Sequence, residues 1–394
     1  MLETGGMHSS LRVLVGSLAP GVLPTTRSDR LPDGTVLLDL GEDHPSRAGL
    51  LELRLWTQDG TVSTAEVVVG AMHRGAEKLF EVREYRQILM LADRHDWQAP
   101  FAGELCVALA CEKMLGLEVP PRAVWLRTLL AEHGRILSHL GFLGYVGRTT
   151  RTPTGLPRLR ERLRGQNRAL TGNRVHPMAN RLGGLAVDAD DGWLAEELAV
   201  LDEVDREMRQ LRLMVDSEEF TARSRGVARL QRDVIMAYGV SGPAARASGL
   251  ELDLRRSEPY LAYPELAELI TTARQDAGDA WARFVQLVEE VAASSRLVRA
   301  AAERLAGRPG PVDVKLPKII KLPEGAGYLS TEAPLGTAGC YLVSRGEKTP
   351  WRLKLRTASF NNVAALEALL IGCRVTDLEM ALASMGYVVG DIDK

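Results

Sequence analysis

The sequence contains few cysteines and no CxxC pair: the four cysteines are Cys106, Cys111, Cys340 and Cys373. Cysteine sites for zinc, nickel or an iron–sulfur cluster usually need closely spaced pairs, so the chain lacks the framework for such a site. Cys106 and Cys111 lie five residues apart in an apolar segment, which places them on different faces of a helix. We therefore predict free, buried, reduced thiols and no metal bound by this chain.

The chain also lacks an excess of either charge, with 49 Lys and Arg against 51 Asp and Glu in 394 residues. A net charge of −2 gives no reason to expect nucleic acid as a partner. Arg160, Arg162 and Arg164 form a local basic run, but acidic stretches elsewhere balance it.

Long uninterrupted apolar runs are missing as well, because charges break every helical window before 18 residues or so. The apolar stretch near the N-terminus is short, follows Glu3 and has Arg12 as its early basic residue, which makes it a poor signal peptide. We therefore expect any membrane association to come through partner proteins.

Motifs of self-contained enzymes are absent from the sequence. There is no GxxxxGK[ST] and no strand-linked GxGxxG, so the chain itself is not expected to bind a dinucleotide. There is also no GxSxG and no HExxH, which argues against a self-contained hydrolase.

Strand patterns occur at both ends of the chain, and helical patterns lie between them. Residues 35–70 alternate as strands, with a hairpin signal at Gln58-Asp59-Gly60. Residues 75–306 have helical spacing, including one long amphipathic helix from Pro264 to Arg304. From residue 310 onward we predict strands, the first at VDVKLP, followed by two short helices.

These patterns predict an α+β fold in which a large central helical bundle is flanked by N-terminal and C-terminal β-strands that pack near one another. The expected regions are an irregular N-terminal segment (1–34), an N-terminal β-region (35–72), a helical body (73–308) and a C-terminal α/β region (309–394).

The segment from residue 100 to residue 117 is apolar on almost every side, which is typical of a helix in the middle of a protein. It nevertheless carries Glu104, Glu112 and Lys113. Because buried charges are costly unless they are paired, we expect these residues either in internal salt bridges or at a site.

Three loops contain candidate site residues. GEDHPSRAG (41–49) contains His44, which is either a turn residue with a local hydrogen bond or a histidine presented into a cavity. ADRHDWQAPF (92–101) groups Arg94, His95, Asp96 and Trp97 at the entry to the apolar helix, where Asp96 is a candidate helix cap. TGNRVHPMANRLGGLAVD (171–188) contains His176 and Arg181, and its alternative interpretation is a hairpin or helix cap with solvated basic residues.

Several separated blocks of sequence occur in a fixed order: GAMHRGAEK (70–78), DRHDWQAPF (93–101), ACEKMLG (110–116), PRAVWLRTLLAEHGRILSHL (121–140), VHPMANRLGG (175–184), AYGVSGPAARASG (237–249), LRRSEPY (254–260), EAPLGTAGCYLVSRG (332–346) and LKLRTASFNN (353–362). Their order and spacing resemble the 49-kDa (D) subunit of proton-pumping NADH:quinone oxidoreductase, respiratory complex I. That family is related to the large subunit of nickel–iron hydrogenases but lacks its metal-binding cysteines, so the resemblance implies a hydrogenase-like fold without the metal site.

The resemblance implies a peripheral-arm subunit that helps to enclose a quinone headgroup and that couples electron transfer to quinone with proton translocation. Electrons would come from a terminal iron–sulfur cluster on a small neighbouring subunit, and NADH would be oxidised on a distant subunit. Further partners would be the C-type peripheral subunit and the membrane subunit at the quinone entrance. The chain would lie on the cytoplasmic face of the plasma membrane, held there by its partners.

The resemblance assigns roles to individual residues. Arg94 matches an arginine near the terminal cluster, and His176 matches a histidine whose protonation is coupled to the redox state of that cluster. His44 matches the first histidine of a β-loop at the quinone site. We add His95 as a candidate proton source because it lies beside that site in the sequence.

Three positions depart from the family pattern. Ala48 stands where the family has a second histidine that hydrogen-bonds a quinone carbonyl, and Trp97 replaces a tyrosine on the other side of the headgroup. Thr149 aligns with an aspartate that partners the loop histidine. Alanine cannot deliver a proton, and an indole N–H donates a hydrogen bond without giving up its proton. Binding is therefore expected to survive more readily than proton delivery.

Two other functions compete with this one. A divergent paralogue would act as a structural scaffold of a complex I-like assembly with lost or altered quinone chemistry, which the three departures favour and the retained Arg94 and His176 oppose. A hydrogenase large subunit would need two CxxC pairs, and the chain has none.

Overall fold

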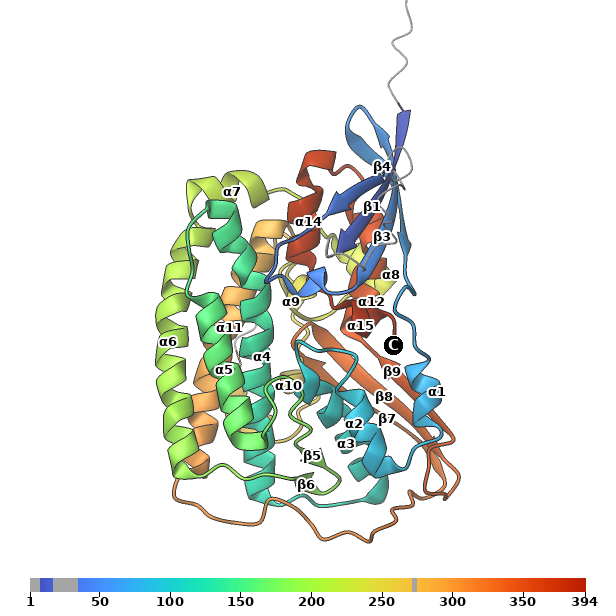
Figure 1. Cartoon of the computed structure of the whole chain (residues 1–394), viewed down its shortest axis with the longest axis vertical. Coiled ribbons are helices and arrows are strands. Elements are labelled where there is room, and N and C mark those ends of the chain that lie inside the picture. Colours follow the sequence, from blue (N-terminus) through green and yellow to red (C-terminus); the bar gives the residue numbers. More distant parts are fainter. Residues whose placement is uncertain (1–7, 17–34, 271–274) are drawn as a thin grey trace, which may run out of the picture.

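The structure is a computed structural model that describes residues 8–16, 35–270 and 275–394. These residues form an α+β fold in which long helices stand side by side on one flank and two larger sheets with shorter helices occupy the other (Figure 1). The predicted fold class is thereby confirmed.

Four long helices form the bundle: α4 (Pro121–Thr150), α5 (Leu156–Thr171), α6 (Asp191–Val215) and α11 (Ala280–Leu305). Helix α4 packs along α11 and α5, and most of its side chains are buried. Pro121 occupies its first turn, where the missing N–H has no partner in any helix. The bundle therefore has α4 at its centre, in contact with the rest of the molecule.

The predicted helix from Pro264 to Arg304 is wrong, because it joins two separate elements. Residues Tyr263–Leu269 form a 3₁₀ helix, η2, and α11 begins only at Ala280. The side chain of Asp279 accepts a hydrogen bond from the Ala282 N–H at 2.9 Å and so starts a new helix. Both elements present apolar residues to the core at helical spacing, which is why the pattern looked continuous.

The N-terminal sheet has the order β2-β1-β3-β4, with β1 (His8–Gly16), β2 (Thr35–Leu38), β3 (Leu50–Gln58) and β4 (Thr61–Val68). The predicted hairpin is confirmed: Asp59 and Gly60 both have positive φ in the tight turn between β3 and β4. The expectation that residues 1–34 are irregular is wrong for residues 8–16, because β1 pairs with two strands and buries Val13 and Val15. Residues 1–7 and 17–34 lie outside the described residues.

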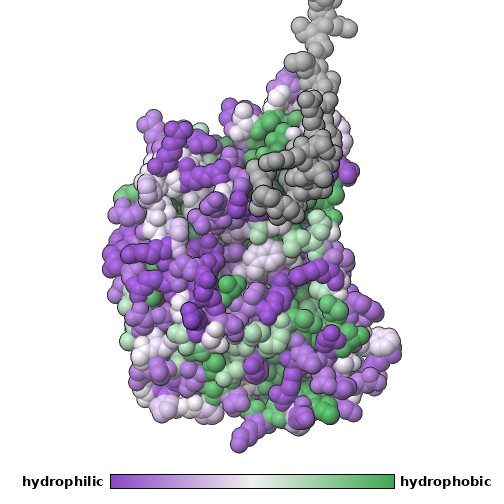
Figure 2. Space-filling model, in the orientation of Figure 1, coloured by the Kyte–Doolittle hydropathy of each residue, from purple (hydrophilic) through white to green (hydrophobic). Residues whose placement is uncertain are grey.

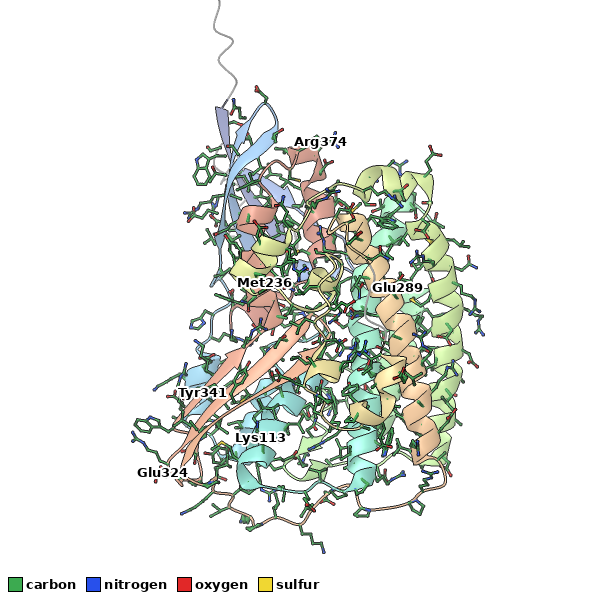
Figure 3. The ribbon with its side chains drawn as sticks, turned by 180° about the vertical axis from the view of Figure 1, so that it is seen from behind. Lys113, Met236, Glu289, Glu324, Tyr341 and Arg374 are labelled. Carbon is green, nitrogen blue, oxygen red and sulfur yellow. The ribbon has the colours of Figure 1, made fainter. Side chains whose placement is uncertain are left out.

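The C-terminal sheet is an antiparallel β7-β8-β9 meander of β7 (Gly325–Ala333), β8 (Gly336–Ser344) and β9 (Arg352–Arg356). Helix α3 (Pro100–Leu115) packs against β7 and β8, while Tyr341 is exposed (Figure 3). The strand predicted at VDVKLP is not formed: this segment is extended but pairs only through single bonds, such as Leu185 N to Val312 O at 2.8 Å.

The two terminal sheets share no strand pair among the described residues, so the expected close packing of terminal strands is wrong. Instead, β4 packs against α13, and the C-terminal helices lie between the sheets (Figure 1). The remaining elements are η1 (Pro45–Arg47), α1 (Ala76–Phe80), α2 (Tyr85–Ala92), β5 (Asn180–Arg181), β6 (Gly184–Leu185), α7 (Glu218–Ser224), α8 (Arg232–Tyr238), α9 (Gly242–Arg246), α10 (Leu254–Ser257), α12 (Ala358–Ala364), α13 (Leu366–Leu369), η3 (Val375–Asp377), α14 (Leu378–Met385) and α15 (Val389–Ile392).

The charges in helix α3 have different fates. Glu112 forms a two-pronged ion pair with Arg127 of α4, at 2.8 and 2.9 Å, as predicted for a buried charge. Glu104 is fully buried without an ion pair among the described residues. Lys113 is exposed at the end of the helix, so its expected burial is wrong (Figure 3).

Within the described part of the chain, no helix is both long enough and apolar enough to cross a membrane. The outer surface over α5 and α6 is mostly hydrophilic (Figure 2).

Candidate functional site

Two of the three candidate loops meet in one pocket of about 410 Å³. The loop around η1 supplies one side, the loop between α2 and α3 supplies the other, and helix α5 closes the pocket. The lining residues are Glu42, Asp43, His44, Pro45, Arg47, Ala48, Trp97, Gln98, Arg160 and Arg164. The three residues predicted for quinone binding, His44, Ala48 and Trp97, are thus brought together.

The loop that carries His44 is held by contacts at both ends. Arg47 forms an ion pair with Asp39 at 3.0 Å, and the Ser46 hydroxyl donates to the carbonyl oxygen of Tyr387 at 2.8 Å. Gly49 adopts a φ of +96°, which side chains other than that of glycine rarely tolerate, and so it turns the chain into β3. The loop is therefore fixed against the C-terminal segment.

Both ring nitrogens of His44 are engaged. Its Nδ1 accepts a hydrogen bond from the Ser46 N–H at 3.3 Å, so Nε2 carries the proton and donates to the Ala383 carbonyl oxygen at 3.2 Å. Burial lowers the pKa of His44 to about 4. The ring also packs edge-on against Phe142, with 5.5 Å between centroids. His44 is therefore a neutral, locally bonded turn residue that also lines a cavity, which combines the two alternatives left by the sequence.

Trp97 is half-buried and packs against the main core. A Cβ atom on Gly390 of α15 would overlap the Trp97 ring and approach the His95 carbonyl oxygen to 2.6 Å, so only glycine fits there. Thr149 does not bond His44: its hydroxyl has no partner among the described residues.

His95 lies outside the pocket lining. Its Nδ1 lies 2.8 Å from Asp391 Oδ1, and Asp391 also accepts a hydrogen bond from the Ser359 N–H at 3.1 Å. Burial alone would raise the pKa of Asp391, but the hydrogen bond and charge of His95 outweigh it and hold that pKa below its usual range. Asp96 accepts from the Gln98 N–H at 3.0 Å and closes the turn before α3, whose N-cap is Ala99, so the predicted cap at Asp96 is wrong in detail.

Arg94 and His176 are brought together at a second place, through a residue that the sequence patterns did not reveal. His176 Nδ1 donates to the Asp93 carbonyl oxygen at 3.2 Å and lies 3.6 Å from Asp93 Oδ2, while Arg94 Nη1 lies 3.3 Å from the same carboxylate oxygen. The Asp93 side chain is fully buried, whereas that of Arg94 is 40% exposed. The third loop also contains the β5–β6 hairpin, as its alternative interpretation expected.

Glu104 is a further buried carboxyl close to this cluster. It accepts from the Asn180 N–H at 2.8 Å, and its other oxygen has no partner among the described residues. Burial raises the pKa of Glu104 to about 8, with the negative charge of Asp93 acting in the same direction. The sequence did signal Glu104, as a charge inside an apolar helix, but gave no sign of its neighbours.

All four cysteines are free and buried. Burial raises the pKa of Cys106 to about 12, so its thiol stays protonated. Among the residues that the structure describes, no group of three or more His, Cys, Asp or Glu side chains is placed to hold a metal ion.

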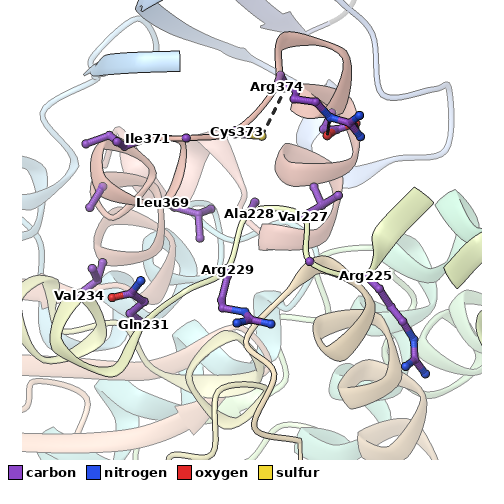
Figure 4. A pocket seen from close by; sticks show the side chains of 14 residues that line it. Arg225, Val227, Ala228, Arg229, Gln231, Val234, Leu369, Ile371, Cys373 and Arg374 are labelled. Carbon is purple, nitrogen blue, oxygen red and sulfur yellow. Dashed lines mark hydrogen bonds and ion pairs between the residues drawn. The ribbon is translucent and has the colours of Figure 1, made fainter. Parts of the chain in front are cut away.

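A larger pocket of about 630 Å³ lies elsewhere and contains none of the predicted site residues (Figure 4). It is formed between the 225–234 and 368–377 segments. Its Arg374 is paired with Asp377 at 2.8 Å, and Arg225 stacks on Trp281. These cations are already partnered, so we do not place the site there.

Comparison with known proteins gives a consistent result. The family model described as respiratory-chain NADH dehydrogenase, 49 Kd subunit, matches residues 146–321 and 314–394. The D-type subunit of NADH-quinone oxidoreductase that is numbered 2 in Salinispora tropica is 51% identical over 91% of this chain and 93% of its own length. The D-type subunit numbered 1 in Streptomyces coelicolor is 49% identical over 91% of this chain and 95% of its own length.

A solved structure also matches in three dimensions. It is the membrane-bound sulfane sulfur reductase, an archaeal respiratory membrane complex, with a TM-score of 0.82 and 29% identity over 87% of this chain and 94% of that chain.

Proposed function

Because the chain belongs to the 49-kDa subunit family of the respiratory-chain NADH dehydrogenase, we propose that its 410 Å³ pocket forms one wall of a quinone-binding site. The chain is a subunit of an oxidoreductase complex. In this proposal electron transfer to quinone in the pocket is coupled to proton translocation by the whole assembly. The observation that carries the proposal is the meeting of His44, Ala48 and Trp97 in one pocket.

The chemistry of the lining supports a planar ligand with polar oxygens. Trp97 offers an aromatic face, and the small side chain of Ala48 leaves room beside it. Gln98 and the arginines supply hydrogen-bond donors. A mostly apolar pocket with a few placed donors is the usual form of a small-molecule site.

Protons for quinol formation are proposed to come from water and not from His44 or His95. A histidine with a pKa of about 4 is neutral at physiological pH and has no extra proton to give. His95 bonds Asp391 outside the pocket, so its proposed role is to hold the Trp97 loop in position.

The cluster of Asp93, Arg94 and His176 is proposed to face the small neighbouring subunit. An iron–sulfur cluster on that subunit would supply electrons one at a time. The buried Asp93 carboxylate holds both cationic side chains, and the exposed Arg94 guanidinium can approach an electronegative group across an interface. NADH oxidation, the C-type subunit and the membrane subunit at the quinone entrance belong to other parts of this proposed assembly, on the cytoplasmic face of the membrane.

The competing proposal is a scaffold with lost quinone chemistry. Ala48 and Trp97 favour it, because neither residue can deliver a proton. The two proposals differ in whether a ligand must enter the pocket.

Filling the pocket separates them. In the assembled complex, Ala48→Trp should lower the rate of quinone reduction about 100-fold or more, because the headgroup can no longer reach its position. The control is Leu213→Trp, at an exposed position on α6 away from the pocket. Equal rates in both variants and the parent, with intact subunit composition, would support the scaffold.

A further inference from the structure

Arg160 of helix α5 is a buried cation without an acidic partner. Its residue is only 7% exposed, and no carboxylate of the described residues lies within ion-pair distance. Its Nη2 donates to Gln98 Oε1 at 2.8 Å, and its Nη1 makes a long contact of 3.4 Å to the Asp43 carbonyl oxygen. Its Nε has no partner among the described residues.

Other buried arginines in this chain are satisfied. Arg127 forms an ion pair with Glu112, and Arg255 forms one with Asp253. Arg283 lacks a carboxylate too, but its donors reach two carbonyl oxygens and the Ser384 hydroxyl. A guanidinium has five N–H donors, so Arg160 stands apart in having donors left unused.

The unused donors belong to a residue of the pocket lining. The other lining arginines are already neutralised: Arg47 is paired with Asp39 at 3.0 Å, and Arg164 with Glu161 at 2.6 Å. Burial lowers the pKa of Arg160 to about 10, which still leaves it charged at neutral pH. The pocket therefore contains one cation whose charge no described carboxylate offsets.

We propose that Arg160 donates a charge-assisted hydrogen bond to an oxygen of the quinone, and that the pocket therefore prefers a quinone with an ionised oxygen over a neutral quinone of similar size. The inference rests on the proposed function, that a quinone enters this pocket. The planar guanidinium fork matches a pair of adjacent oxygens, such as a carbonyl beside an ionised hydroxyl. Arg160 thus supplies the strong donor that Ala48 does not.

The test uses the assembled complex and two probes, 1,4-naphthoquinone and the ionised form of 2-hydroxy-1,4-naphthoquinone, with binding measured by calorimetry. The parent should bind the ionised probe more tightly than the neutral one. Arg160→Met should weaken binding of the ionised probe about 10- to 100-fold, the size of one charge-assisted hydrogen bond, with a smaller change for the neutral probe.

Three further variants keep the result interpretable. Arg160→Gln retains a donor without charge and should also lose the preference for the ionised probe, which preserves the test if Arg160→Met fails to assemble. Arg168→Met removes an exposed arginine from the same helix outside the pocket and should leave both affinities unchanged. Gln98→Met removes the hydrogen-bond partner of Arg160 but leaves its charge, so it should lose less affinity than Arg160→Met.

The outcomes distinguish the two proposals. If the parent binds neither probe, the proposed quinone site is wrong. If the parent binds both probes and the two Arg160 variants bind the ionised probe as tightly as the parent, the inference alone is overturned. If Gln98→Met loses as much affinity as Arg160→Met, Arg160 acts by positioning the Trp97 loop, and direct donation to the ligand is overturned.

Discussion

His44 is neutral in the folded chain because it is surrounded by apolar atoms and because both nitrogens have neutral partners. Its pKa of about 4 lies below the ordinary value of 6.5, so the unfolded chain binds more protons between these pH values. Stability contributed by the neutral form is present above pH 6.5 and is lost as the pH falls toward 4. A shift of this size corresponds to about 3 kcal/mol.

We therefore expect His44→Gln to change the acid sensitivity of the chain. Glutamine keeps an acceptor and a donor but cannot titrate, so the parent should lose about 3 kcal/mol more of its unfolding free energy than the variant between pH 7 and pH 4. Urea unfolding at several pH values measures this difference. Parallel pH profiles for the two proteins would mean that His44 is not protonated on unfolding.

The sequence identified those site residues that carry an unusual chemistry in a loop, but not the residues that complete their surroundings. His44, Ala48 and Trp97 were found because a loop pattern singled out their positions. Arg160 was visible only as part of a basic run, and its burial depends on how α5 packs against two loops about 60 and 115 residues away in sequence. Such packing leaves no local sequence pattern.

Helices α4 and α11 are joined by a buried network of charges as well as by apolar contacts. Glu132 of α4 contacts Arg255 at 3.1 Å and accepts hydrogen bonds from Tyr263 and Ser294, each at 2.6 Å. Burial alone would raise the pKa of Glu132, but Arg135 and Arg255 outweigh it and set that pKa at about 2. The carboxylate is therefore ionised and fully satisfied, and it ties three elements to α4.

Replacing Glu132 by glutamine should destabilise the chain by about 3–5 kcal/mol, because Arg255 would be left buried beside a neutral group. The matched control is Glu303→Gln, an exposed glutamate on α11, for which we expect a change within about 0.5 kcal/mol. Chemical denaturation of both variants tests this. A loss below about 1 kcal/mol for Glu132→Gln would show that the network adjusts to the missing charge.

At the scale of elements, the periodic patterns predicted the bundle and the strand-rich ends, but not where the elements stop or pair. The division between η2 and α11 depends on a single cap at Asp279, and the strand β1 is recognised only through its partners on either side. The C-terminal sheet was expected to meet the N-terminal one, yet the short C-terminal helices fill that space. Long-range pairing of this kind is decided by packing and not by alternation within a segment.

The whole chain presents two features at different places, a pocket that takes a ligand and an Asp93–Arg94–His176 cluster with an exposed cation. A protein of this kind does its chemistry across interfaces, so groups that matter for activity need not matter for its own stability. Arg94 is 40% exposed, and an ion pair with that exposure contributes little to folding. This separates a functional role for Arg94 from a structural one.

We therefore expect Arg94→Met to change the unfolding free energy by less than about 1 kcal/mol but to lower quinone reduction in the assembled complex about 10-fold or more, as loss of a neighbouring hydrogen-bonding group does at other metal centres. Removal of a positive charge should also shift the reduction potential of the partner's cluster to lower values, which redox titration by electron paramagnetic resonance measures. Arg83→Met, at an exposed arginine just before α2, is the control and should change neither quantity. If Arg94→Met kept both the potential and the rate of the parent, this face of the chain would not lie against the electron donor, and the scaffold proposal would gain the support that Arg94 now denies it.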